Sequence, residues 1–171
     1  MDFKKTSNRS RELQLVAFML GEETYGVDIS QVEEIIRFQP VTRVPGAPDF
    51  VEGVINLRGR VIPVIDLRKR FNLGQKELTK STRVMVVEVS PHTVGMIVDA
   101  VDEVLRINEE QIEPPSPLIA SIDAEYIQGV GKLEDKLIIL LDLSSVLSKE
   151  ETEDLTRLEK ESQEIINEEE S

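Results

Sequence analysis

An internal repeat is the feature that most limits what this chain can fold into. Residues 51–67 align without a gap to residues 127–143, with identical amino acids at 53/129, 54/130, 57/133, 62/138, 66/142 and 67/143. Residues 24–37 align in the same way to residues 93–106. The two offsets, 76 and 69, differ by seven residues, which we assign to a longer loop around Pro114–Pro117. We therefore expect two copies of one structural unit.

Each copy ends in a pattern that is typical of a β-hairpin. In the first copy, the apolar runs 53–57 and 61–65 flank the dipeptide Arg58-Gly59. Glycine adopts the positive φ that a two-residue hairpin turn needs, so we expect Arg58 at an exposed tip. Pro63 has no backbone N–H and cannot donate a bond across the sheet, which predicts that its strand lies at a sheet edge or carries a bulge.

The short strands and frequent turns predict a mainly β fold built from small barrels. Strands this short cannot bury their faces in a flat sheet, whereas a closed or nearly closed barrel can. We expect a domain over residues 13–147 made of two duplicated subdomains, at about 20–82 and 83–147, with a first strand that can be shared between them. A polar tail, residues 1–12, should be flexible.

Residues 148–171 differ in kind from the rest of the chain. Acidic residues dominate this segment, and Leu155, Leu158, Ile165 and Ile166 recur at near-helical spacing. The spacing predicts an acidic C-terminal helix whose narrow apolar stripe packs on the body of the protein.

Composition argues against several classes of partner and site. The formal charge is −13, which opposes a general affinity for nucleic acid or for anionic lipid. Seven aromatic residues, none of them Trp, offer few platforms for stacking bases. The absence of Cys excludes disulfides and thiolate metal sites. No apolar run approaches the ~20 residues of a membrane span, and the N-terminus lacks a signal-peptide core, so we expect a cytoplasmic protein that does not insert into a membrane.

The residues that carry most enzyme chemistry are sparse or have simpler roles. His92 is the only histidine, and its Ser-Pro-His-Thr context predicts a solvated turn. No Gly-x-Ser-x-Gly motif presents a nucleophile. Asp66 and Asp142 recur at matched positions, and we interpret each as the N-cap of a short helix after its hairpin. We predict no catalytic residue, no cofactor and no metal site. An acidic hydrolase is the enzyme alternative, and it would need clustered carboxylates with a raised pKa in a pocket.

Arg58 is the residue that the repeat does not explain. Its matched position in the second copy is Glu134, so the duplicated fold does not require a cation there. An exposed arginine in a turn is usually only solvated, but arginine is also favoured at protein–protein hot spots because of its planar, multi-donor head. Apolar residues expected near this turn are mostly interpreted as barrel core; they are Val32, Ile35, Val41, Val44 and Val54.

Two sequence blocks around this turn identify a family. Both blocks resemble the bacterial chemotaxis coupling protein family CheW. The first, residues 53–67, reads Gly-Val-Ile-Asn-Leu-Arg-Gly and, after Arg60, Val-Ile-Pro-Val-Ile-Asp-Leu. The second, residues 25–35, begins Tyr-Gly-Val-Asp-Ile. The resemblance runs from about Leu13 to Leu147. It implies two tandem, intertwined, five-stranded SH3-like barrels with short helices.

The same resemblance implies a function and a set of residues. Members are adaptors, not enzymes, that join the regulatory domain of the histidine kinase CheA to the cytoplasmic tips of methyl-accepting chemoreceptors. Positions that affect this coupling in the family match Val32, Glu34, Gly53 and Arg58 here. Whether Glu34 and Arg58 pair with each other or with a partner is left open by the sequence. The alternative is another protein-interaction barrel module. A coupling protein fused to a receiver domain is not expected, because no receiver pattern follows Leu147.

Overall fold

The computed structural model describes residues 11–75, 77–89, 91–115 and 122–170, except for the side chains of residues 162 and 165–170. The expected flexible tail, residues 1–12, lies almost wholly outside this part. The side chains of Ile165 and Ile166, expected on the apolar stripe of the last helix, lie outside it as well.

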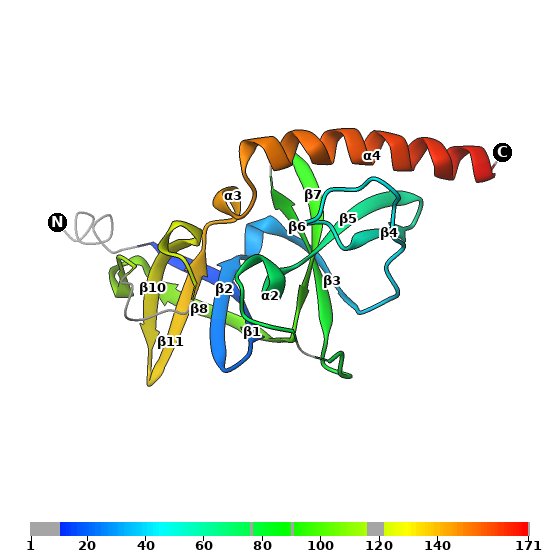
Figure 1. Cartoon of the computed structure of the whole chain (residues 1–171). Helices are drawn as coiled ribbons and strands as arrows, with labels where there is room; N and C mark the ends of the chain where they lie inside the picture. The colour runs from blue at the N-terminus through cyan, green and yellow to red at the C-terminus, as the bar shows by residue number, and fades with distance from the viewer. Residues whose placement is uncertain (1–10, 76, 90, 116–121, 171) are drawn as a thin grey trace.

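Two strongly curled sheets dominate the described part of the chain (Figure 1). The six-stranded sheet has the order β8-β1-β2-β11-β10-β9, and the five-stranded sheet has the order β3-β6-β7-β5-β4. The first contains β1 (Glu12–Leu20), β2 (Glu23–Asp28), β8 (Ala100–Asn108), β9 (Ile112–Glu113), β10 (Ile127–Leu133) and β11 (Lys136–Leu141). The second contains β3 (Val32–Arg37), β4 (Gly53–Leu57), β5 (Arg60–Asp66), β6 (Arg83–Val89) and β7 (His92–Val98). The predicted mainly β fold with two barrel-like units is confirmed.

The two sequence copies exchange strands. The repeat matches β1 and β2 to β6 and β7, and it matches β3, β4 and β5 to β8, β10 and β11. Each sheet nevertheless combines the first two strands of one copy with the later strands of the other. The parallel pair Leu140 with Gly26 in one sheet corresponds by repeat to the pair Val64 with Gly95 in the other. Residues 20–82 and 83–147 therefore each contribute strands to both sheets.

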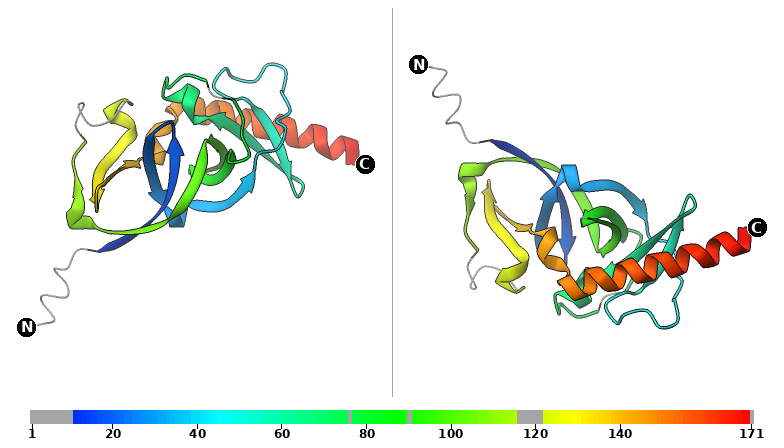
Figure 2. Two further views of the ribbon diagram at one scale, coloured as in Figure 1. Left: turned by 90° about the horizontal axis from the view of Figure 1, so that it is seen from below. Right: turned by 90° about the horizontal axis from the view of Figure 1, so that it is seen from above.

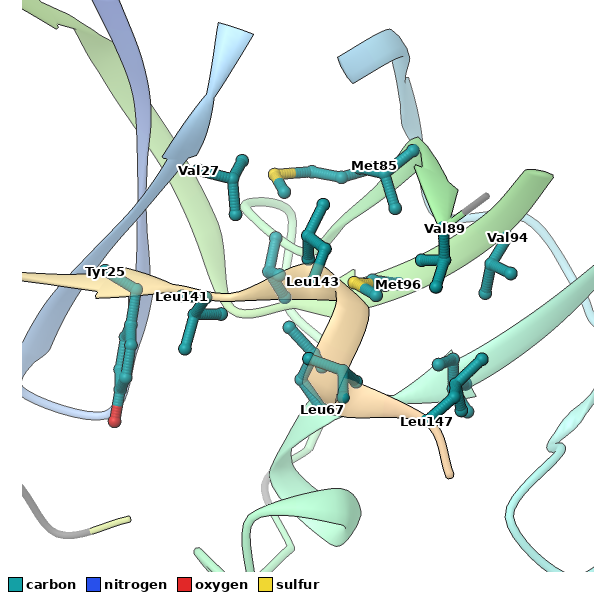
Figure 3. Close-up of a cluster of buried hydrophobic side chains, with 14 of the residues drawn as sticks. Tyr25, Val27, Leu67, Met85, Val89, Val94, Met96, Leu141, Leu143 and Leu147 are labelled. Carbon is teal, nitrogen blue, oxygen red and sulfur yellow. The ribbon is translucent and has the colours of Figure 1, made fainter. Parts of the chain in front are cut away.

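The main hydrophobic core lies between the sheets and belongs to both (Figure 3). The buried side chains labelled there are Tyr25, Val27, Leu67, Met85, Val89, Val94, Met96, Leu141, Leu143 and Leu147. Two smaller clusters contain further buried side chains at repeat-related positions: Val84, Ile62 and Val64 in one, and Leu15, Ile138 and Leu140 in the other. Because the main cluster draws on both sheets, neither sheet buries its inner face alone.

Short helices follow the hairpins as the sequence predicts. Helix α2 (Leu67–Arg70) begins after Asp66, whose carboxylate accepts from the backbone N–H of Arg68. Helix α3 (Leu143–Val146) begins after Asp142, which accepts from the N–H of Ser144. The interpretation of both aspartates as N-caps is confirmed. The described part of the chain also contains the 3₁₀ turns η1 (Ile29–Gln31), η2 (Glu109–Gln111) and η3 (Ala124–Tyr126).

The prediction that the Pro63 strand lies at a sheet edge or carries a bulge is wrong. Strand β5 is internal, between β7 and β4. Its parallel pairing with β7 begins only at Val64, however, so the missing N–H of Pro63 falls in a stretch that needs no donor on that side.

The last helix, α4 (Lys149–Glu170), lies along the five-stranded sheet and extends away from β10 and β11, toward the opposite side of the molecule (Figures 1 and 2). It begins with a reciprocal capping box between Ser148 and Glu151. Leu155 and Leu158 are buried in the main core, which confirms that the helix packs on the body. The helix also covers His92, whose ring contacts Thr156 and Glu159. His92 is buried, so the prediction that it is solvated is wrong.

Candidate protein-interaction surface

The turn between β4 and β5 has the backbone conformation of a tight two-residue hairpin. Arg58 and Gly59 have φ values of 54° and 86°, in the left-handed region that non-glycine residues rarely adopt. The Asn56 side chain accepts a 2.8 Å hydrogen bond from the N–H of Gly59 and so holds the turn from inside. Arg58 therefore occupies a sterically unfavourable position at the tip of a well-formed turn.

Arg58 and Glu34 form a two-pronged ion pair. Arg58 Nη1 donates to Glu34 Oε1 at 3.1 Å, and Nη2 donates to Oε2 at 2.6 Å. The guanidinium holds the pKa of the Glu34 carboxyl below its ordinary value of 4.5. The Arg58 side chain remains 69% exposed and that of Glu34 30% exposed. The sequence left their pairing open, and the structure pairs them with each other while leaving Arg58 accessible.

A second polar network runs beside this pair. Arg60 contacts Glu33 at 3.5 Å and donates to Thr93 Oγ1 at 3.1 Å, and Thr93 in turn donates to Glu33 Oε2 at 2.8 Å. A register irregularity between Val32 and Glu34 marks a bulge in β3, a feature that re-aims side chains. Strands β3 and β4 are the two ends of the sheet order. The Arg58–Glu34 pair therefore joins the β4–β5 turn to the opposite end of the curled sheet, and the second network joins β5 and β7 to β3. We call Glu33, Glu34, Arg58, Arg60 and Thr93 the hairpin surface.

The other two predicted site residues are placed differently. Gly53 is buried at the start of β4 with a φ of 154°, and a Cβ there would lie 2.4 Å from the carbonyl oxygen of Thr42. Its role in the structure is therefore to let two backbone segments approach closely. Val32, at the start of β3, is partly buried against the main core. Only Glu34 and Arg58 of the four residues contact each other through charged groups on the surface.

Sequence reasoning missed two kinds of residue at this surface. Ile29 and Ile35 lie on the η1–β3 segment that carries Glu33 and Glu34, and 37% and 40% of their surface is exposed. Ile35 was interpreted mainly as core. Gln163 of α4 hydrogen-bonds the backbone of Gly59 and Val61. No pattern in the sequence signals that contact, because it joins residues about a hundred positions apart.

One pocket has features that an acidic hydrolase would need. A pocket of about 650 Å³ between α2, the 48–50 segment and α4 contains Asp66, Glu151 and Asp154. Burial raises the pKa of Asp66, but its carboxylate is engaged in capping α2. Glu151 is paired with Arg70, and hydrogen bonds from Arg70 and Ser148 lower its pKa despite burial. Asp66 therefore caps α2, and Glu151 caps α4 and ties its first turn to Arg70 of α2.

Among the residues described, no group of three or more His, Asp or Glu side chains is arranged to hold a metal ion. None of the described helices combines the length and the apolar character needed to cross a bilayer.

Two intertwined, strongly curled sheets with a charged, exposed hairpin define a small domain of barrel-like β architecture. The family model described as the CheW-like domain matches residues 14–151. A chemotaxis protein CheW of Klebsiella aerogenes is 40% identical over 138 residues, which covers 81% of this chain and 83% of that protein. One from Treponema pallidum is 38% identical over 151 residues, with 86% and 89% covered. The chain belongs to the CheW-like family.

A solved structure agrees with this assignment. The scaffolding protein TtCheW from Thermoanaerobacter tengcongensis superposes with a TM-score of 0.74 at 42% identity, covering 82% of this chain and 91% of that one. The family predicted from the hairpin motif is therefore confirmed, and with it the place of this chain among chemotaxis scaffold proteins.

Proposed function

We propose that this protein is a cytoplasmic adaptor that couples methyl-accepting chemoreceptors to the histidine kinase CheA. It binds the cytoplasmic tips of the receptors and the regulatory domain of the kinase, and it catalyses no reaction itself. Neither nucleic acid nor direct membrane insertion is part of this function. The observation that carries the proposal is the exposed Arg58 at the tip of a strained hairpin in a chain of the CheW-like family.

The hairpin surface suits a helical partner with acidic groups. A guanidinium has five N–H donors, and the two bonds to Glu34 leave others for a carboxylate of a partner. Ile29 and Ile35 offer apolar contacts on the adjoining segment. An amphipathic receptor hairpin presents both acidic and apolar groups. The kinase would instead bind through a similar barrel that contacts the apolar strand ends of this protein.

The mechanism needs no reacting group. An adaptor transmits a receptor state only by binding one arrangement of the kinase better than another, and the coupling free energy equals that difference in affinity. In this scheme, four residues bind a partner or hold the residues that do: Val32, Glu34, Gly53 and Arg58.

A binding comparison tests this function. Wild-type protein should bind both the receptor tips and the kinase regulatory domain in a pull-down or by calorimetry. Arg58→Glu should weaken binding to at least one of them by about tenfold or more. It replaces a hydrogen-bond donor with a carboxylate, which acidic groups of the partner would repel. Unchanged binding to both partners would remove Arg58 from the proposal. A failure of the wild-type protein to bind either would overturn the function.

A further inference from the structure

Strand β5 has a short edge without a strand partner next to the Arg58 turn. Its pairing with β7 begins at Val64, while Arg60 pairs with Leu57 of β4 on the other side. The backbone groups of Gly59 and Val61 that point away from β4 therefore need another partner.

A side chain from the far end of the sequence supplies that partner. Gln163 Nε2 donates to the carbonyl oxygen of Gly59 at 3.2 Å, and Gln163 Oε1 accepts from the N–H of Val61 at 3.4 Å. A glutamine amide has the donor and acceptor of a peptide group, so it substitutes for a neighbouring strand. The contact fixes the turn on the C-terminal side of Arg58, opposite the Asn56 bond inside the turn.

Helix α4 is firmly attached to the sheet on the N-terminal side of Gln163. Arg70 pairs with Glu151 at the first turn of the helix. His92 lies between Glu159, 3.2 Å from its Nδ1, and Thr156, 3.1 Å from its Nε2. Leu155 and Leu158, in the same part of the helix, are 1% and 3% exposed. These contacts anchor the helix on the turns that precede Gln163.

We propose that Gln163 is a positioning residue for Arg58, and that α4 is therefore part of the partner-binding surface. The inference rests on the proposed function. By holding Gly59 and Val61, Gln163 restricts the turn to the conformation in which Arg58 faces Glu34 and the partner. Its loss leaves the domain folded, because the buried leucines stay in place, but lets the turn sample other conformations and lowers affinity.

The test uses the full-length chain and a neighbouring control. Gln163→Leu removes both hydrogen bonds and keeps a side chain of similar size, whereas Glu164→Ala changes the next, exposed residue. Amide hydrogen exchange at Val61 should quicken by about threefold to tenfold in Gln163→Leu and stay unchanged in Glu164→Ala. Affinity for the partner that contacts Arg58 should fall by about the same factor.

A double-mutant cycle separates positioning from general support. In an Arg58→Ala background, Gln163→Leu should weaken binding no further, because no guanidinium is left to position. Equal affinity of Gln163→Leu and wild type would overturn the inference and leave the proposed function standing. A full additional loss in the Arg58→Ala background would also overturn it. Absence of binding by the wild-type chain would overturn the proposed function, and the inference with it.

Discussion

The hairpins β4–β5 and β10–β11 occupy matched positions in the two sheets and have the same turn geometry. Their first turn residues, Arg58 and Glu134, have φ values of 54° and 58°. An ion pair next to each hairpin is also repeated. Arg60 meets Glu33 at 3.5 Å in the five-stranded sheet, and at the matched positions Lys136 meets Asp102 at 3.6 Å in the six-stranded sheet. Backbone geometry and one supporting charge pair thus belong to the duplicated fold.

The difference between the hairpins lies in what each presents to solvent. The pair of Arg58 with Glu34 is matched by Glu134 and Glu103, two like charges. Helix α4 covers Val61, which is 9% exposed, while its matched residue Leu137 is 43% exposed. The same fold tolerates both surfaces. Of the two hairpins, the first therefore has the opposite-charge pair and the covering helix, and these are the features that we propose to serve recognition.

The largest expected effect comes from two matched glycines, Gly53 at the start of β4 and Gly129 within β10. Gly53→Ala should cost about 3 kcal/mol or more, since φ is 154° and the new Cβ would meet a backbone oxygen at 2.4 Å. Gly129→Ala should cost about half as much, because its first clash is with a methyl group of Ile112 on a two-residue strand. Urea unfolding measures both losses. Equal losses in the free energy of unfolding would contradict the difference in steric contacts at Gly53 and Gly129.

A charge exchange separates the structural from the recognition role of the ion pair. The double variant Glu34→Arg with Arg58→Glu keeps opposite charges in contact but reverses the charge at the tip. We expect normal folding and a loss of partner binding of about tenfold or more, as for Arg58→Glu alone. Calorimetry against the receptor tip and the kinase regulatory domain measures it. Recovery of wild-type affinity would mean that the pair serves only the fold.

Removing backbone strain from the second hairpin should stabilise the protein without affecting its partners. Glu134→Gly places the residue that tolerates positive φ at a turn position with φ 58°, for an expected gain of about 1 kcal/mol in the free energy of unfolding. Binding of both partners should match the wild type. Weaker binding in this variant would show that the second hairpin also takes part in recognition.

The smallest expected effect is electrostatic. Arg58 lowers the pKa of Glu34, so the pair stabilises the fold above the ordinary glutamate value of 4.5 and loses its contribution as the pH falls through the lowered pKa. In Arg58→Ala, the Glu34 pKa should return toward 4.5, and the difference in stability from wild type should vanish in acid. Carboxyl NMR titration with matched unfolding curves measures both. A Glu34 pKa that does not move would exclude the pair in solution.

The repeat and the turn residues were sufficient to predict the β-rich duplicated fold and the helix caps. They predicted Pro63 and His92 wrongly, because strand order and coverage by α4 depend on contacts between distant segments. For the site, the mismatch between Arg58 and Glu134 singled out Arg58, the position that we propose for partner binding. The pairing with Glu34 depends on how the sheet curls and on a bulge in β3, and the contact with Gln163 depends on where α4 docks. Local patterns carry neither kind of information.

Reconstitution of receptor, kinase and adaptor is the most direct test of the claim that coupling uses the first hairpin and not the second. Kinase autophosphorylation should respond to receptor ligand with wild-type protein and with Glu134→Arg, and the response should be lost with Arg58→Glu. A wild-type response in the presence of Arg58→Glu, or its loss with Glu134→Arg, would contradict that claim.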